Sequence, residues 1–133
     1  MILAFTCCQL LPAVGLAAAG GSWSATGHGG ELGVGNQAMT TQPLSAPAGH
    51  VGGARVVSYS WDVQLFTTPE ASVRVDLCSA QRCTRLSGLS GRASHLAGDG
   101  AEGPFRFIYR VETHGRLMPP LQILSNQLTV NYR

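Results

Sequence analysis

Residues 73–86 read VRVDLCSAQRCTRL, and their pattern predicts a β-hairpin. Val73, Val75 and Leu77 alternate with polar or charged residues, which is typical of a strand with one buried face. Cys78 and Cys83 then flank the four residues SAQR, which can form the turn between two strands.

The register of this hairpin follows from placing the two cysteines opposite each other. Asp76 then faces Arg85, which is a favourable cross-strand charge pair. Apolar side chains fall on the other face, and a slip of one residue would lose both matches. The opposed pairs that we expect are Cys78–Cys83, Leu77–Thr84, Asp76–Arg85 and Val75–Leu86.

The first 19 residues, MILAFTCCQLLPAVGLAAA, predict a signal peptide for export. They are apolar and end in Ala17-Ala18-Ala19, which fits the A-x-A cleavage pattern, with Gly20 as the new N-terminus. No Lys or Arg precedes the apolar run, so either the start codon lies upstream or the signal is atypical. An uncleaved membrane anchor is one alternative, but the run is short for a span. A lipid anchor at Cys7 or Cys8 is another, but Ala4-Phe5-Thr6 does not give the usual Leu-then-small pattern before the cysteine. We therefore expect a signal peptide at 1–19 and one domain at 20–133.

Cleavage would leave only two of the four cysteines, Cys78 and Cys83. Two cysteines in an exported chain are expected to pair, because the compartment is oxidising. Their spacing of four residues differs from the two-residue spacing of redox and zinc motifs. The sequence therefore predicts a structural disulfide, which closes a short loop and mainly holds the register.

Alternation with a period of two recurs at Val56–Leu65, at Phe105–Val111 and around Leu128, Val130 and Tyr132. A shorter candidate strand covers Glu31–Gln37. Turn signals separate the runs, and no stretch has a helical apolar period. The pattern predicts an all-β protein, an antiparallel β-sandwich. The expected turns or loops are 43–53, 67–71, 88–103 and Met118-Pro119-Pro120, with 38–54 and 87–103 as the longest loops.

Composition excludes several classes of protein. The chain has 133 residues, 44% of them apolar and 12% charged, which argues against disorder. All nine basic residues are Arg, and the net charge of +2 is too small to predict nucleic-acid binding.

No catalytic or metal-binding motif is present. We find no nucleophile elbow, phosphate loop or dinucleotide fingerprint, and the four histidines lack the paired spacing of metal ligands. Asp99 and Glu102 share a loop, but two acids are too few for calcium. We expect no enzyme activity, no cofactor and no metal. One further hypothesis is a hydrolase whose carboxylates lie far apart in the chain. It requires two acids that face one cleft.

Two surfaces are candidates for binding. Arg106, Ile108 and Arg110 share one strand face, which can meet an acidic or polar partner or simply be solvated. Trp61 is either a carbohydrate platform or a core residue, and its neighbours on the strand favour the core. An exported carbohydrate-binding or other ligand-binding module is the alternative function, and it requires Trp61 or Trp23 to be exposed.

Three segments resemble the FlhE family of flagellar operons: residues 73–86, residues 104–121 (PFRFIYRVETHGRLMPPL) and residues 125–133 (SNQLTVNYR). The likeness covers roughly residues 55–133 and is weaker around Trp23–Leu44. The Cys-x4-Cys hairpin and the terminal motif are specific when taken together. The leader lacks the basic start of the family, and the loop at 88–103 is individual.

This resemblance implies a periplasmic accessory protein of the flagellar type III export system. The family is associated with swarming motility, with limiting proton leakage through the export apparatus, and with chaperone-like prevention of filament growth in the periplasm. The implied partners are the export apparatus or the rod, hook and filament subunits, and no catalytic residue is carried over. By position, Cys78 and Cys83 match the family pattern as structural residues, and Asn126, Asn131, Tyr132 and Arg133 match it as either structural or partner-facing residues. The candidate partner-binding residues are Arg106, Arg110, Arg116, Asn126, Asn131, Tyr132 and Arg133.

Overall fold

The computed structural model describes residues 20–47 and 51–133, so the predicted signal peptide lies outside the described residues. Within this part the chain forms nine β-strands and no helix, and so contains no helix that could span a membrane. The strands are β1 (Gly21–His28), β2 (Glu31–Val34), β3 (Ala38–Thr40), β4 (Val56–Thr67), β5 (Val73–Cys78), β6 (Cys83–Arg85), β7 (Ser90–Ala93), β8 (Arg106–Val111) and β9 (Arg116–Tyr132).

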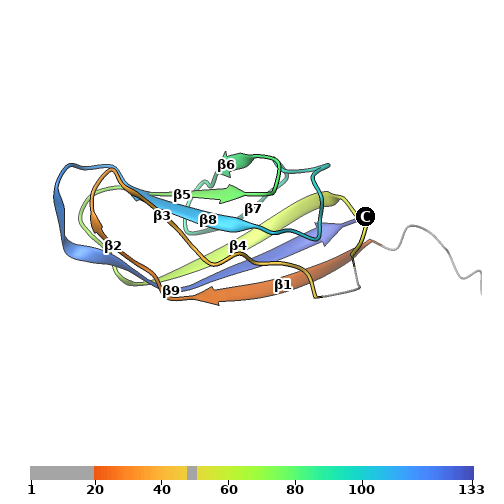
Figure 1. Cartoon of the computed structure of the whole chain (residues 1–133), viewed down its shortest axis with the longest axis horizontal. Helices are drawn as coiled ribbons and strands as arrows, with labels where there is room; N and C mark the ends of the chain where they lie inside the picture. The colour runs from red at the N-terminus through yellow and green to blue at the C-terminus, as the bar shows by residue number, and fades with distance from the viewer. Residues whose placement is uncertain (1–19, 48–50) are drawn as a thin grey trace, which may run out of the picture.

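The strands form two antiparallel sheets that pack face to face (Figure 1). The first sheet has the order β1-β9-β4-β7, with β2 also paired to β9, and the second has the order β3-β8-β5-β6. The predicted antiparallel β-sandwich is therefore confirmed. β4 and β9 form the longest pairing of the first sheet, and the chain ends beside the start of β1.

The core lies between the sheets and is built from alternate residues of the strands. Phe107 and Tyr109 of the second sheet face Tyr59, Leu128 and other inward side chains of the first, and all four are buried. Burying one such side chain contributes about 1.5–3 kcal/mol. Trp61 is a core residue, as its strand pattern predicted, with 4% of its surface exposed.

The hairpin forms in the predicted register. Cys78 is opposite Cys83 and bonded to it, and Asp76 is opposite Arg85. The predicted ion pair between Asp76 and Arg85 is nevertheless wrong, because each side chain has another partner. Asp76 accepts from Arg74 Nε at 3.3 Å, while Arg85 turns to Glu112 at 3.4 Å. Both arginines project from the same face of the sheet, so the nearer one on β5 takes the carboxylate.

The predicted turn at Met118-Pro119-Pro120 is also wrong, because these residues lie inside β9. Proline lacks a backbone N–H and is tolerated in a sheet only at edges and irregularities. Here the two prolines fall where the β2–β9 register shifts, between the pairs Leu32–Leu121 and Val34–Arg116. Because the β2–β9 pairing is irregular there, no backbone N–H is needed from either proline, and β9 continues through them.

Smaller differences concern the segments predicted as loops. The loop expected at 87–103 contains β7, the region 38–54 contains β3, and β1 was not predicted. The strand expected at 31–37 ends earlier, at Val34. A β carbon at Gly35 would collide with the backbone of Thr113, and Asn36 has a positive φ of 57°. The chain turns at these two residues.

Candidate functional site

A cleft of about 770 Å³ opens at the edge of the sandwich where β6 and β7 are the outermost strands. We call it the edge cleft. Its apolar lining comes from both sheets and includes residues of the β4–β5 and β6–β7 connections. The apolar lining residues are Trp61, Leu65, Ala71, Val73, Val75, Leu86, Leu89 and Ala93. A volume in this range is usual for ligand-binding clefts.

The cleft exists because the outer strands are shorter than the strands they cover. β7 pairs with β4 only as far as Asp62, with one further bond from Val63 N–H to the carbonyl of Leu89 at 2.7 Å. β4 itself continues to Thr67. In the second sheet, the pairing of β6 with β5 ends at the hydrogen bond from Leu86 N–H to the carbonyl of Val75, at 2.9 Å. The first residues of β5 therefore extend beyond their partner.

Trp61 holds one wall of the cleft in place. Its indole Nε1–H donates to the carbonyl of Gly88 at 2.9 Å, which ties the β6–β7 connection to β4. Gly91 lies directly over the ring, because a β carbon there would come within 2.8 Å of the indole. Deeper in the sandwich, burial raises the pKa of Tyr59, while the Thr84 hydroxyl, the His95 backbone and the Arg82 charge partly lower it.

The rim of the edge cleft is cationic. Its lining includes Arg74, Arg85, Arg92 and His95 and no carboxylate of the described chain. Arg92 donates to Ser58 Oγ at 3.2 Å, and the other two arginines form the ion pairs given above. The Arg85–Glu112 pair is solvent-exposed, whereas the Arg74–Asp76 pair is partly buried. An exposed pair contributes only about 0–1 kcal/mol, so an anionic ligand can compete for Arg85.

The outer face of the second sheet continues this cationic rim. Arg106, Ile108 and Arg110 share that face, as predicted, and Arg106 and Arg110 are exposed. Arg74 lies directly opposite Arg110 in the β5–β8 register. Like charges opposite each other destabilise a sheet, so the Arg74–Arg110 pair does not stabilise the pairing of β5 with β8. Arg110 donates to the carbonyl of Asn36 at 3.0 Å.

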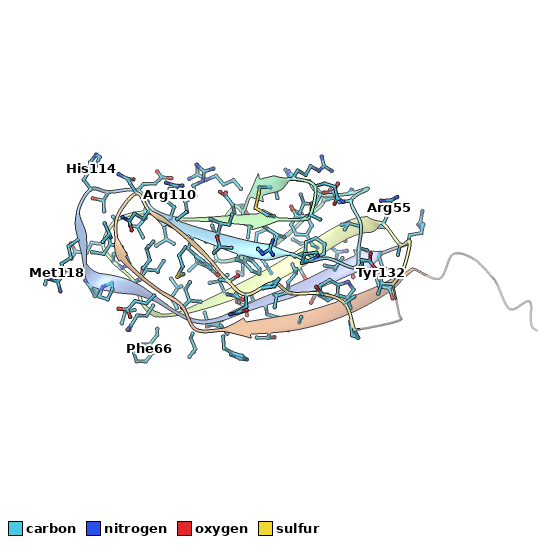
Figure 2. All side chains as sticks on the ribbon, viewed as in Figure 1. Arg55, Phe66, Arg110, His114, Met118 and Tyr132 are labelled. Atoms are coloured by element: carbon cyan, nitrogen blue, oxygen red, sulfur yellow. A yellow bond between two sulfur atoms is a disulfide. The ribbon has the colours of Figure 1, made fainter. Side chains whose placement is uncertain are left out.

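The other candidate residues do not gather in one place. Arg116 is exposed beside Val34, near the end that carries Met118 in Figure 2, whereas Tyr132 lies at the opposite end. Asn131 donates to Ser58 on the outer face of the first sheet at 3.1 Å, and Arg133 pairs its backbone with Arg55. The sequence therefore places these residues on several surfaces rather than in one site.

Asn126 belongs to the core, with 1% of its surface exposed. It projects between the sheets beside Tyr109, and neither side chain has a well-formed hydrogen bond within the described residues. Burial raises the pKa of the Tyr109 hydroxyl, and the Asn126 side chain offsets part of that rise. Asn126 also touches the position where Gly27 would carry a β carbon. A direct contact of Asn126 with a partner is incompatible with this burial.

The described residues show no cluster of three or more His, Cys, Asp or Glu side chains that could hold a metal. His50 lies outside them. None of the five main clefts of the described residues contains more than one carboxylate. The facing pair of acids that the hydrolase hypothesis requires is therefore not found in these clefts. Trp23 is buried like Trp61, so neither indole can form the exposed platform of a carbohydrate-binding module.

Sequence patterns did not indicate the edge cleft. Leu65 and Val73 were recognised as strand residues, but nothing in the sequence showed that their neighbours would end early. The one available signal was the mismatch in length between the strand at 56–65 and the glycine-rich stretch that follows the hairpin.

Comparison with known proteins agrees with this architecture. The family model described as flagellar protein FlhE matches residues 29–133. A flagellar protein FlhE from Yersinia enterocolitica is 40% identical over 88% of this chain and 84% of its own length. The flagellar protein FlhE from Escherichia coli is 38% identical over 93% of this chain and 94% of its own.

A solved structure supports the same relationship. The crystal structure of FlhE superposes with a TM-score of 0.78 and 37% identity, covering 86% of this chain and 97% of the other. Family match, relatives and fold agree: the chain belongs to the FlhE family of flagellar proteins.

Proposed function

We propose that this protein is a non-enzymatic, periplasmic accessory protein of the flagellum that acts on the flagellar type III export system. Its role is chaperone-like or limits proton leakage during flagellar assembly and swarming. Membership of the FlhE family supports a flagellar accessory role. The observation that carries a binding role is the edge cleft, an apolar slot with open strand edges and a cationic rim.

A periplasmic location is part of this proposal. Residues 1–19 would direct export, and the Cys78–Cys83 disulfide suits an oxidising compartment. Fractionation of the cell envelope tests the location, and N-terminal sequencing of the recovered protein should begin at Gly20. Recovery of the protein in the cytoplasmic fraction, with both thiols reactive, would contradict it.

The mechanism that we propose is masking of an exposed β-edge or apolar surface on a rod, hook or filament subunit. A sheet edge with unpaired N–H and C=O groups is a ready template for pairing with another chain, and a temporary partner prevents uncontrolled association. An exposed segment of this kind matches the open edges of the cleft.

The test is deletion of the gene in its flagellated host, followed by measurement of swarming, of filament location and of periplasmic pH. We expect at least one of the three to change and to be restored by the wild-type gene. Normal behaviour in all three would defeat the proposal. Crosslinking in the periplasm of the complemented strain then identifies the partner.

A further inference from the structure

We infer that the edge cleft binds an extended segment of a partner protein as an added β-strand, and that this segment alternates apolar side chains with carboxylates. The inference rests on the proposed function in one respect only, namely that the partner is a protein. The chemistry of the segment follows from the backbone edges, the apolar lining and the charge of the rim.

The backbone groups of Val73 are available for strand addition. The carbonyl of Ser72 accepts from Glu112 N–H at 3.0 Å on the β8 side, and the carbonyl of Val75 accepts from Leu86 N–H on the β6 side. Hydrogen-bonding groups alternate in direction along a strand. The N–H and C=O of Val73 therefore point toward the edge that β6 leaves uncovered.

The same reasoning applies to the opposite wall. Val63 N–H points toward β7, since it bonds to Leu89. β4 continues beyond Val63 to Thr67, but β7 does not extend so far, so this edge of β4 has no β7 partner around Leu65. A segment lying in the cleft thus meets one open edge from each sheet, and main-chain hydrogen bonds to either edge would hold it in an extended form.

The lining determines which side chains the segment carries. An extended strand directs alternate side chains to opposite sides. One set would enter the cleft, where it meets Trp61, Val75 and Leu86, all buried apolar residues. Apolar side chains fit there, and a charged side chain would lose its hydration without a partner.

The cationic rim determines which side chains the bound segment carries on its other side, the side that points out of the cleft. Side chains that point out of the cleft reach Arg74 and Arg85, whose carboxylate partners Asp76 and Glu112 do not line the cleft. Asp or Glu at these positions gains a charge-assisted hydrogen bond, whereas Lys or Arg meets like charge. A second copy of this chain is a poor occupant, because none of its described strands carries more than one carboxylate.

The experiment uses protein recovered from the cell envelope and three fluorescent ten-residue peptides. Each peptide alternates Val with a second residue, which is Glu, Ser or Lys. Fluorescence anisotropy measures the affinities, and backbone amide chemical shifts locate the bound peptide. We expect the Glu peptide to bind about tenfold or more tightly than the Lys peptide, the Ser peptide to fall between, and shifts to concentrate at Leu65 and Val73.

Two variants separate the backbone contribution from the charge contribution. Val73→Pro removes the N–H that points to the open edge without removing a bond to β8, and it should weaken binding of all three peptides by about tenfold. Arg85→Glu should weaken the Glu peptide and strengthen the Lys peptide. Arg55→Glu is the matched control, because Arg55 is also exposed but lies at the far end of the molecule (Figure 2).

Absence of binding by the Glu peptide would overturn the inference. So would a preference for the Lys peptide, equal binding by wild type and both cleft variants, or chemical-shift changes confined to other surfaces. If Val73→Pro does not fold, Arg85→Glu alone decides the question, since its side chain is exposed.

Failure of the inference and failure of the proposed function give different results. Peptide binding with the stated sensitivities in a protein whose deletion leaves flagella normal would uphold the cleft and reject the flagellar role. A deletion phenotype together with no peptide binding would reject the cleft and uphold the role.

Discussion

The indole of Trp61 donates its N–H to the carbonyl of Gly88 at 2.9 Å, and the indole of Trp23 donates to the carbonyl of Ala101 at 2.7 Å. The two bonds differ in their surroundings. Ala101 is fully buried, whereas Gly88 lies on an exposed connection. A carbonyl that loses its donor can be rehydrated at Gly88 but not at Ala101.

Replacement of each tryptophan by phenylalanine should reveal this difference. Trp23→Phe leaves a buried acceptor unsatisfied and should lower the free energy of unfolding by about 1–3 kcal/mol from the hydrogen bond alone. For Trp61→Phe, the loss from the hydrogen bond alone should be about 1 kcal/mol, and the β6–β7 connection should loosen. Urea denaturation measures the stabilities, and amide exchange at Val63 reports the connection. A larger loss of stability for Trp61→Phe than for Trp23→Phe would contradict this prediction.

Gly91 should tolerate no side chain, because a β carbon would lie 2.8 Å from the Trp61 ring. We expect Gly91→Ala to lower the free energy of unfolding by about 1–3 kcal/mol through overpacking. Gly88→Ala is the control in the adjoining connection, since no atom lies within 4 Å of its β-carbon position. Its effect should stay within about 0.5 kcal/mol. Thermal unfolding of both variants tests this difference in stability. Equal melting temperatures for Gly91→Ala and Gly88→Ala would contradict the prediction.

The disulfide should contribute modestly to stability. Residues 78 and 83 are separated by five positions, so the bond closes a small loop and removes little entropy from the unfolded chain. Replacing both cysteines by alanine should lower the free energy of unfolding by about 2 kcal/mol. The register pairs on either side should persist in amide exchange. Complete loss of folding would show that the bond, rather than the alternation of side chains, sets the register.

Local patterns allowed prediction of the fold where pairing is local. The hairpin register followed from Val75, Leu77 and the two cysteines, because all of its partners lie within a few residues. The continuation of β9 through Pro119 could not be predicted, since it depends on an irregularity in the distant strand β2. β1 was missed for a related reason. Its sequence GSWSATGH has few apolar residues, and its pairing partner lies at the other end of the chain.

The site was less predictable than the fold. Arg106 and Arg110 were recognised on a shared face, but their neighbour Arg74 comes from another strand and only the β5–β8 register brings it opposite Arg110. The edge cleft arises from differences in strand length between paired segments. Such differences result from tertiary packing, and no pattern within a single strand records them. Asn126 has the polar character of a surface residue, yet it lies in the core.

Tyr109 gives the fold a sensitivity to alkaline pH. Burial raises the pKa of its hydroxyl well above the ordinary value of 10.0, so the folded protein keeps the proton at a pH where the unfolded chain has lost it. Stability is therefore unaffected below about pH 10 and falls as the pH rises above that value, by up to about 1.4 kcal/mol per pH unit for this group. Burial of Tyr59 acts in the same direction.

Tyr109→Phe removes this group and should make the loss of stability above pH 10 less steep. It also removes a buried hydroxyl that lacks a well-formed hydrogen bond within the described residues, so stability at neutral pH should change little. Urea denaturation at pH 7, 9, 10 and 11 gives the two curves. The difference between variant and wild type should be constant from pH 7 to 9 and should then shift in favour of the variant. Parallel curves up to pH 11 would mean that the Tyr109 hydroxyl is accessible to water in the folded protein.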